Sequence, residues 1–345
     1  LYTFREALQE SVNVCAVKIL SQVGVDYSAD IVEKFGLSTL VDSDLNLAAL
    51  GLGGMTDGAT TLDMASAYST FVNQGVHKEY SCYTKVTTRN GELILEPEVK
   101  ETKVLDSGVA WIMTDVLKSV VSEGIGYPAA ISGVQVGGKT GTTDKQFDIW
   151  FCGFTPTYSA ALWIGNDVNI SLSRYSDAAA RLWSTVMSQV DGAYGGSYPS
   201  APGNVTSAKI DTKSGLLATE ASGSHVRTEY FTTGTAPTES DTAHKSASVC
   251  TGSGYLATPS CPSTVSKSGI MRPYIPSTKV TDYGSELPHY YCNLHNPDPE
   301  DYPAEPGKNV TIVTPKPTGP VPDYTYGSDD DDDDDDSPKP GWDYN

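Results

Sequence analysis

The chain has 345 residues, with 23 Lys and Arg against 43 Asp and Glu, so its formal net charge is -20. This charge argues against a basic surface that contacts nucleic-acid phosphates or an anionic membrane. Apolar residues make up 39% of the sequence, which is enough for a sizeable core. No stretch approaches the roughly 20 apolar residues that a membrane span needs.

The proline content divides the chain. Residues 1–195 contain three prolines and residues 196–345 contain eighteen, and the aliphatic periodicity fades at the same boundary. We therefore expect a globular domain over residues 1–195 and a Gly/Ser/Thr/Pro-rich extension over residues 196–314 that forms a small β-rich module. Residues 315–345 are expected to be a disordered tail, because they include eight consecutive aspartates that repel one another.

The first domain begins with helix signals. Thr3 and Glu6 have the spacing of a capping box ahead of a short helix, and a second helix is expected over residues 13–23. Asn90-Gly91 predicts a hairpin turn between two strand-like runs. Further helices are expected over 29–35, 60–72, 106–121 and 178–190.

Three strand-like runs follow the long helix, over residues 134–142, 149–155 and 158–164. Consecutive strands with helices before and after them are typical of α+β domains. We therefore expect an antiparallel sheet covered by helices, with Trp111, Trp163 and Trp183 in its core.

The sharpest local motif is Gly-Gly-Lys-Thr-Gly-Thr-Thr at 137–143, on the first of these runs. A lysine cation, hydroxyl groups and bare backbone suit the binding of an extended peptide and its carboxylate. Residues 133–140 also match the phosphate-loop pattern G-x-x-x-x-G-K-T. That motif needs a helix directly after it, whereas Gly141-Thr142 follows here, so a phosphate loop is disfavoured.

A second signal is Ser11-Val12-Asn13, between the first two helices. Taken alone, it predicts only that Ser11 ends one helix and that Asn13 caps the next. Its meaning changes beside a Lys-Thr-Gly strand. Serine acyl-transfer sites combine an S-x-x-K motif, a serine–asparagine motif and a K-T-G strand.

With these blocks in place, residues 3–167 resemble the C-terminal part of the transpeptidase domain of class A penicillin-binding proteins. Residues 210–219, 231–239 and 250–261 resemble the C-terminal extension of such proteins in Gram-positive bacteria. The blocks that carry the first resemblance are Arg5-Glu6-Ala7-Leu8, Ser11-Val12-Asn13-Val14, Thr60-Thr61-Leu62-Asp63-Met64-Ala65, Gly138 to Thr143, Gly153-Phe154-Thr155-Pro156 and Trp163-Ile164-Gly165-Asn166-Asp167.

The resemblance implies a penicillin-binding fold and D,D-transpeptidation of peptidoglycan stem peptides. By carry-over, Ser11 relays a proton to the leaving amine, and Asn13 holds the substrate amide and a catalytic lysine. Lys139 supplies positive potential. Thr140 and Thr142 bind the substrate carboxylate, and Gly141 leaves room for close approach. The resemblance implies no cofactor and no metal ion at this site.

One element of the family pattern is missing. None of the lysines in the sequence has a serine three positions before it, so S-x-x-K is absent. We expect the nucleophilic serine and its lysine base to precede Leu1. Residues 1–345 alone are therefore expected to be inactive. A glycosyltransferase domain and a membrane anchor are expected further upstream, which implies an extracytoplasmic, membrane-anchored protein.

The implied partners are D-Ala-D-Ala stem peptides, β-lactams and the cell-wall synthesis machinery, with no nucleic acid. Two other functions stay open. The first is a non-catalytic surface binding protein that keeps the fold. The second is a D,D-carboxypeptidase or a β-lactamase-like hydrolase.

The six cysteines form no C-x-x-C pair. We expect buried thiols at Cys15, Cys82 and Cys152. In the extension, Cys250 and Cys261 form a plausible disulfide; the alternative is a zinc site with Cys292 and His295, although the spacing differs from common zinc fingers. Residues 214–219 echo residues 253–258, which predicts two equivalent turns in one β module.

Overall fold

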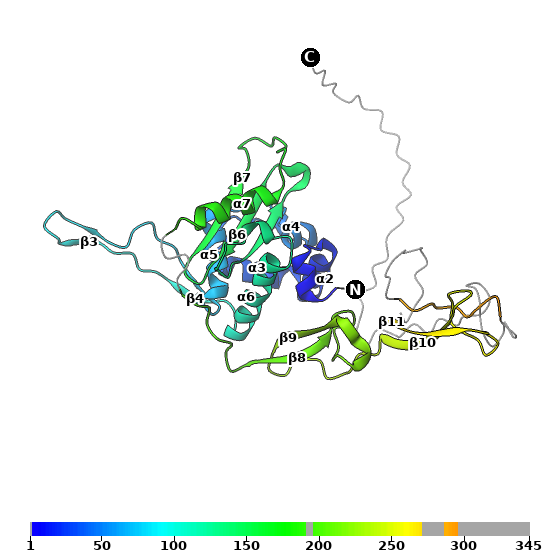
Figure 1. The fold of residues 1–345 in the computed structure, drawn as a ribbon. Coiled ribbons are helices and arrows are strands. Elements are labelled where there is room, and N and C mark those ends of the chain that lie inside the picture. The colour runs from blue at the N-terminus through cyan, green and yellow to red at the C-terminus, as the bar shows by residue number, and fades with distance from the viewer. Residues whose placement is uncertain (1, 191–195, 271–285, 296–345) are drawn as a thin grey trace, which may run out of the picture.

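The computed structural model describes residues 2–190, 196–270 and 286–295 (Figure 1). The predicted acidic tail, residues 315–345, lies outside these ranges, as does part of the predicted extension. The domain boundaries expected from proline content therefore stay a prediction.

The centre of the first domain is a three-stranded antiparallel sheet. Strands β5 (Gly137–Thr142), β6 (Ile149–Phe154) and β7 (Ser159–Ile164) lie in the order β5-β6-β7. The register pairs Thr140 with Phe151 and Phe151 with Leu162. This confirms the expected α+β class with an antiparallel sheet, and it makes β5 an edge strand.

Helices cover both faces of the sheet (Figure 1). Side chains alternate between the two faces along a strand, so Phe151 and Phe154 of β6 point in opposite directions. Phe151 packs against Trp183 of α7 (Ser176–Met187), with ring centroids 5.2 Å apart. The opposite face packs against α5 (Thr61–Val72) and α6 (Ser107–Ser122).

The main core lies between the sheet and α7. Its side chains come from the end of α6, from the segment between α6 and β5, from the sheet and from the buried stripe of α7. The buried members are Val121, Ala129, Ile131, Val136, Ile149, Phe151, Ala179, Ala180, Trp183 and Met187.

The N-terminal helices precede the sheet in the chain. In α1 (Phe4–Gln9) the predicted capping box is present: Glu6 N–H donates to Thr3 Oγ1, and Thr3 N–H donates to Glu6 Oε2. The following helices are α2 (Asn13–Val23), α3 (Val25–Lys34) and α4 (Leu47–Leu52).

Short strands connect α5 and α6. Strand β1 (Val76–Lys78) pairs with β4 (Glu101–Lys103), and β2 (Val86–Thr87) pairs with β3 (Leu93–Leu95). The β2–β3 hairpin projects away from the sheet (Figure 1). Gly91 at its turn has φ +89°, a conformation that glycine adopts without steric cost. This confirms the predicted Asn-Gly turn.

The described part of the extension contains two hairpins. Strand β8 (Val205–Asp211) pairs with β9 (Val226–Thr232), and β10 (His244–Cys250) pairs with β11 (Thr264–Ile270). Short 3₁₀ helices lie in both parts of the described chain. Those of the first domain are Asp42–Asp44, Tyr127–Ala129 and Asp144–Gln146, and that of the extension is Glu220–His225.

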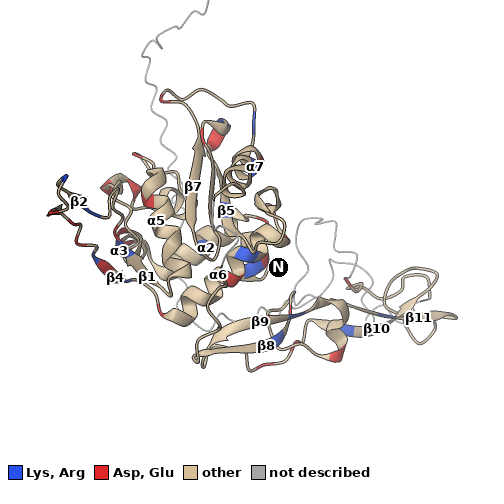
Figure 2. Ribbon diagram, turned by 60° about the vertical axis from the view of Figure 1, so that its left-hand side comes forward, with Lys and Arg blue, Asp and Glu red and all other residues tan. Residues whose placement is uncertain are grey.

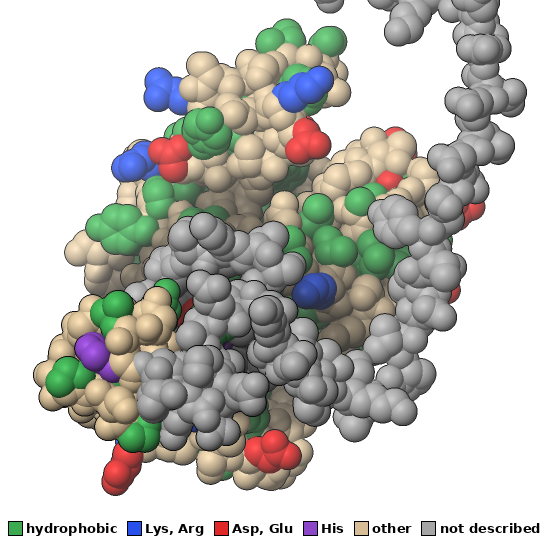
Figure 3. Space-filling model, turned by 90° about the vertical axis from the view of Figure 1, so that its right-hand side faces the viewer, with side chains coloured by type: hydrophobic (Ala, Val, Ile, Leu, Met, Phe, Trp, Pro, Cys, Tyr) green, Lys and Arg blue, Asp and Glu red, His purple; other side chains and the backbone are tan. Residues whose placement is uncertain are grey.

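Charged residues of both signs are interspersed along α3, β1 and β4 (Figure 2). On the face drawn in Figure 3, the visible charged side chains are scattered among polar and hydrophobic ones. No helix in the described ranges combines the length and the apolar character needed to cross a lipid bilayer.

Several burial predictions need correction. Trp183 is buried as expected, but Trp163 is 38% exposed and Trp111 only half-buried. Cys152 is a buried thiol, whereas Cys82 is exposed and Cys15 half-buried. Periodicity identifies the apolar face of an element, but not how far another element covers it.

Candidate active site

Ser11 lies at a sharp break between α1 and α2. Its φ of +54° is left-handed, which is uncommon for a residue other than glycine. The amide of Val12 reaches back to the carbonyl of Ala7, 2.8 Å away, and this closes the end of α1. The serine side chain is thereby held at the break instead of on a helix face.

Gln9 fixes α1, and with it Ser11, against α6. Its buried amide group donates to Glu123 Oε2 at 3.2 Å and lies 3.4 Å from the Ser119 carbonyl. The Gln9 carbonyl accepts from Ile125 N–H at 3.0 Å. A Cβ at Gly124 would lie 2.7 Å from the Gln9 carbonyl oxygen, so only glycine allows this approach.

Lys139 of β5 reaches across to this break. Its Nζ donates to Ser11 Oγ at 2.8 Å and to the Thr140 carbonyl at 3.0 Å. Burial of the ammonium group lowers the pKa of Lys139 to about 8. The lysine is therefore still mostly protonated at neutral pH, in surroundings that strengthen its electrostatic effect.

The next residues of β5 line the same strand. Thr140 is buried and its Oγ1 lies 3.4 Å from Lys139 Nζ. A Cβ at Gly141 would lie 3.3 Å from Trp150 Cβ, which is tight. Thr142 is exposed at the end of the strand. Because β5 ends the sheet, its outer edge is not paired with any strand of the described residues, and an extended peptide can hydrogen-bond to such an edge.

Asn13 lies two residues after Ser11 and is exposed. It is the first residue of α2, whereas Val12 occupies the N-cap position. The prediction that Asn13 caps this helix is therefore wrong by one residue. Within the described ranges, the Asn13 side chain makes no hydrogen bond to Lys139.

The end of β5 is held by Asp148, a carboxylate directly before β6. Asp148 Oδ2 accepts from Thr143 Oγ1 at 3.0 Å, and Asp148 Oδ1 accepts from Trp163 Nε1 at 2.9 Å. The Asp148 amide also donates to Thr143 Oγ1 at 2.9 Å. The carboxylate next to the strand start was a detectable signal for a structural role, but its partner Trp163 was expected in the core.

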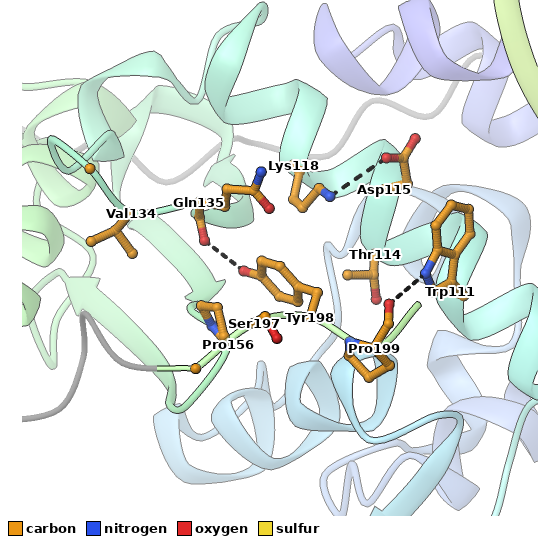
Figure 4. Close-up of a pocket in the computed structure, with 12 residues that line it drawn as sticks. Trp111, Thr114, Asp115, Lys118, Val134, Gln135, Pro156, Ser197, Tyr198 and Pro199 are labelled. Atoms are coloured by element: carbon orange, nitrogen blue, oxygen red, sulfur yellow. Dashed lines mark hydrogen bonds and ion pairs between the residues drawn. The ribbon is translucent and has the colours of Figure 1, made fainter. Parts of the chain in front are cut away.

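A cavity of about 410 Å³ lies beside α6 and is separate from this cluster (Figure 4). Tyr198 projects into it and donates to the Gln135 carbonyl at 2.7 Å, while Lys118 Nζ lies 5.1 Å from the Tyr198 ring centroid. Neither Ser11 nor Lys139 lines this cavity.

The cluster of Ser11, Lys139 and Thr140 combines groups that suit acyl-transfer chemistry. A buried cation attracts a carboxylate or stabilises a developing anion. Because Lys139 donates to Ser11 Oγ, the serine proton remains available for donation to another group. The open strand edge adds backbone donors and acceptors for a peptide.

Comparison with known proteins identifies the family. Residues 1–188 match the model of the penicillin binding protein transpeptidase domain, and residues 201–246 match the model of the penicillin-binding protein 1A C-terminal domain. Penicillin-binding protein 1A of Clostridium botulinum (strain Langeland) is 39% identical over 294 residues, which cover 83% of this chain and 36% of that protein. Penicillin-binding protein 4 of Bacillus subtilis is 35% identical over 170 residues, or 49% of this chain and 27% of that protein.

A solved structure shares the fold. The crystal structure of penicillin-binding protein 1A from Haemophilus influenzae matches with a TM-score of 0.58 and 23% identity, over 70% of this chain and 41% of that one. The matches to the Clostridium botulinum proteins cover most of this chain but only about a third of each relative's length. On the strength of the transpeptidase-domain match and this identity, the chain belongs to the penicillin-binding protein transpeptidase family.

Proposed function

We propose that this chain supplies the distal part of a D,D-transpeptidase site that cross-links peptidoglycan stem peptides by serine acyl transfer. The observation that carries the proposal is the 2.8 Å contact between Lys139 Nζ and Ser11 Oγ. These residues are far apart in the sequence and belong to the two motifs that the family combines at its acyl-transfer site.

In the proposed reaction, a serine outside these 345 residues attacks the carbonyl carbon between the two D-Ala residues. The bond to the terminal D-Ala nitrogen breaks, and that nitrogen takes a proton relayed by Ser11. The remaining acyl group stays on the serine oxygen as an ester. An amine of a second stem peptide then attacks the ester, forms the cross-link and returns the proton to the serine.

The residues of β5 recognise the acyl donor in this scheme. Lys139 favours the substrate carboxylate electrostatically, and the hydroxyl groups of Thr140 and Thr142 bind it. The Thr142 N–H, together with the N–H of the nucleophile, stabilises the oxyanion, where one donor is typically worth roughly 10²–10³ in rate. Asn13, exposed at the start of α2, holds the substrate amide and the lysine of the S-x-x-K motif.

The same proposal sets the location and partners of the protein. Peptidoglycan lies outside the cytoplasm, so the site works on the outer side of the cell membrane, held there by an anchor in the longer protein. A glycosyltransferase in that protein would supply the glycan strands. β-Lactams resemble the acyl donor and would trap the nucleophilic serine, and no cofactor is needed.

The test uses a protein in which these residues are joined to a segment that carries an S-x-x-K motif. We expect intact-mass spectrometry to show a gain of one penicillin per chain. Lys139→Ala should slow this acylation by roughly 10²-fold or more, because the cation next to Ser11 is lost. Lys100→Ala is the matched control: Lys100 is 72% exposed and pairs with Glu79 at 3.7 Å, so its rate should not change.

Other outcomes separate the alternatives. A folded longer chain that gains no mass is a binding protein with the family scaffold. Release of free D-Ala without cross-linked product would mark a carboxypeptidase, and rapid hydrolysis of the penicillin would mark a β-lactamase-like enzyme. A penicillin adduct on residues 1–345 alone would contradict the assignment of the nucleophile to another segment.

A further inference from the structure

The extension contains two turns with the same backbone hydrogen bonds. In the first, Gly215 N–H donates to the Asp211 carbonyl at 2.8 Å and Asp211 N–H donates to the Leu216 carbonyl at 2.8 Å. In the second, Gly254 N–H donates to the Cys250 carbonyl and Cys250 N–H to the Tyr255 carbonyl, both at 2.8 Å. The predicted repeat is therefore real in three dimensions.

The correspondence continues after each turn. Leu217 forms an antiparallel bridge with Ile210 and a parallel bridge with Ser240; Leu256 forms the same two bridges with Val249 and Tyr291. Asp241 N–H donates to the Leu217 carbonyl at 2.7 Å, and Cys292 N–H donates to the Leu256 carbonyl at 2.8 Å. The two halves of the extension are thus copies of one structural unit.

Four side chains occupy equivalent positions in the two units. Each unit has one at the turn, one three residues after a threonine that both units share (Thr219 and Thr258), and two on the third segment, spaced three residues apart. The first unit carries Asp211, Ser222, Asp241 and His244, and the second carries Cys250, Cys261, Cys292 and His295.

In the first unit the set is a polar cluster. His244 Nδ1 lies 2.8 Å from Asp211 Oδ2 and 3.0 Å from Asp241 Oδ2. Ser222 Oγ accepts from Thr219 N–H at 3.1 Å. These contacts join the third segment to the turn.

In the second unit three free thiols and one imidazole converge. His295 Nδ1 lies 3.5 Å from Cys250 Sγ and 3.4 Å from Cys292 Sγ. Cys261 Sγ accepts from Thr258 N–H at 3.3 Å. All four ligand atoms lie within 4.8 Å of one another, with Cys250 and Cys292 buried.

These spacings suit a tetrahedral zinc ion. With Zn–S bonds of about 2.3 Å and Zn–N bonds of about 2.0 Å, tetrahedral angles put sulfur about 3.5 Å from nitrogen and about 3.8 Å from another sulfur. The two sulfur–nitrogen distances already have this value. A disulfide between Cys250 and Cys261, the pairing expected first from the sequence, is not formed and would leave the third thiol unpaired.

We propose that Cys250, Cys261, Cys292 and His295 bind one structural zinc ion. In the second unit this ion would have the role that the polar cluster has in the first unit. On binding, the thiol protons are released to solvent, because thiolates are the zinc ligands. The ion would fasten residues 286–295 to β10 in a unit whose strand β11 is largely exposed. Small units with little core commonly depend on such a metal.

The test measures bound zinc on the whole chain, purified under reducing conditions and dialysed against metal-free buffer. Elemental analysis should find about one zinc per chain. A triple variant, Cys250→Ser with Cys261→Ser and Cys292→Ser, removes the three thiolate ligands and should lose the zinc. Cys82→Ser, which alters an exposed thiol elsewhere, should keep it.

Cobalt provides a second readout on the unmodified chain. Co²⁺ added to the zinc-free chain should give the visible bands of a tetrahedral thiolate site, and these should shrink with Cys261→Ser, a side chain that the first unit already accommodates. The proposal fails if the reduced chain holds well below one zinc, if the triple variant binds as much zinc as the natural sequence, or if peptide mapping finds Cys250 disulfide-bonded to Cys261.

Discussion

Lys139 keeps an ammonium group out of water, and that has a cost for folding. Its Nζ is satisfied by Ser11 and Thr140 oxygens, and within the described ranges no carboxylate forms an ion pair with it. Burial accordingly lowers its pKa to about 8 from 10.5. A cation held in this way favours an anionic ligand, which would restore the missing counter-charge.

The first prediction concerns this residue. Between pH 8 and 10.5 the unfolded chain binds more protons at Lys139 than the folded chain, so the free energy of unfolding should rise with pH in this window. Lys139→Met removes the buried charge and should stabilise the protein by about 1–3 kcal/mol at pH 7. Urea denaturation should show this gain shrinking as the pH approaches 10.5.

The exposed Lys100 offers the comparison for that experiment. Lys100→Met should change stability by less than about 0.5 kcal/mol at every pH, because a surface charge loses little hydration on folding. If the effect of Lys139→Met is equally independent of pH, then burial does not perturb the lysine.

At the scale of elements, β5 can approach β6 closely because it is rich in glycine. A Cβ at Gly138 would lie 2.6 Å from the Cys152 carbonyl oxygen and 2.6 Å from Phe151 Cζ. The Phe151 ring is fully buried and packs edge-on against Trp183, so it has no room to withdraw. The position of Lys139 therefore depends on its glycine neighbour.

The second prediction follows from this packing. Gly138→Ala should force β5 away from β6 and cost about 1–3 kcal/mol in the free energy of unfolding, measured by chemical denaturation. In a protein that joins these residues to a segment with an S-x-x-K motif, it should also slow penicillin acylation. Gly54→Ala is the control, since a Cβ there would meet nothing within 4 Å; equal costs for both variants would rule out this steric explanation.

Elements set by local chemistry could be predicted from the sequence. Thr3 caps α1 as its spacing with Glu6 indicates, and the Asn90-Gly91 turn forms where expected. Burial was less predictable, because it depends on distant partners. Trp163 looks like a core residue in a periodic run, yet it lies at the surface, where it donates to Asp148.

The candidate site was predicted only through family resemblance. Spacing alone does not bring Ser11 beside Lys139, because the two are separated by 128 positions and joined only through the fold. The left-handed backbone of Ser11 and the anchoring of Gln9 on α6 have no local signature. The four ligands of the extension could be named from the sequence only as an alternative to a disulfide, because Cys292 and His295 approach Cys250 only when two strands and a third segment pair.

At the scale of the whole molecule, the extension is joined to the transpeptidase domain through polar and aromatic contacts. Arg5 of α1 forms a buried ion pair with Glu229 of β9 at 2.7 Å and another with Asp115 of α6 at 2.8 Å. Beside them, the Trp111 and Tyr230 rings pack edge to face at 4.9 Å. Helix α1, which positions Ser11, is therefore bound to both the transpeptidase domain and the extension.

The last prediction is that Arg5 couples the unfolding of the transpeptidase domain to the unfolding of the extension. Arg5 is 4% exposed, and Arg5→Ala leaves the carboxylate of Glu229 with only the weaker partner Arg227, at 3.4 Å. Removing one member of a buried pair typically costs about 3–5 kcal/mol. We expect calorimetry to show a lower Tm and two separated transitions in place of one. Arg181→Ala breaks an exposed pair with Asp177 and should leave the single transition unchanged; if Arg5→Ala does the same, the extension is held by the aromatic contact instead.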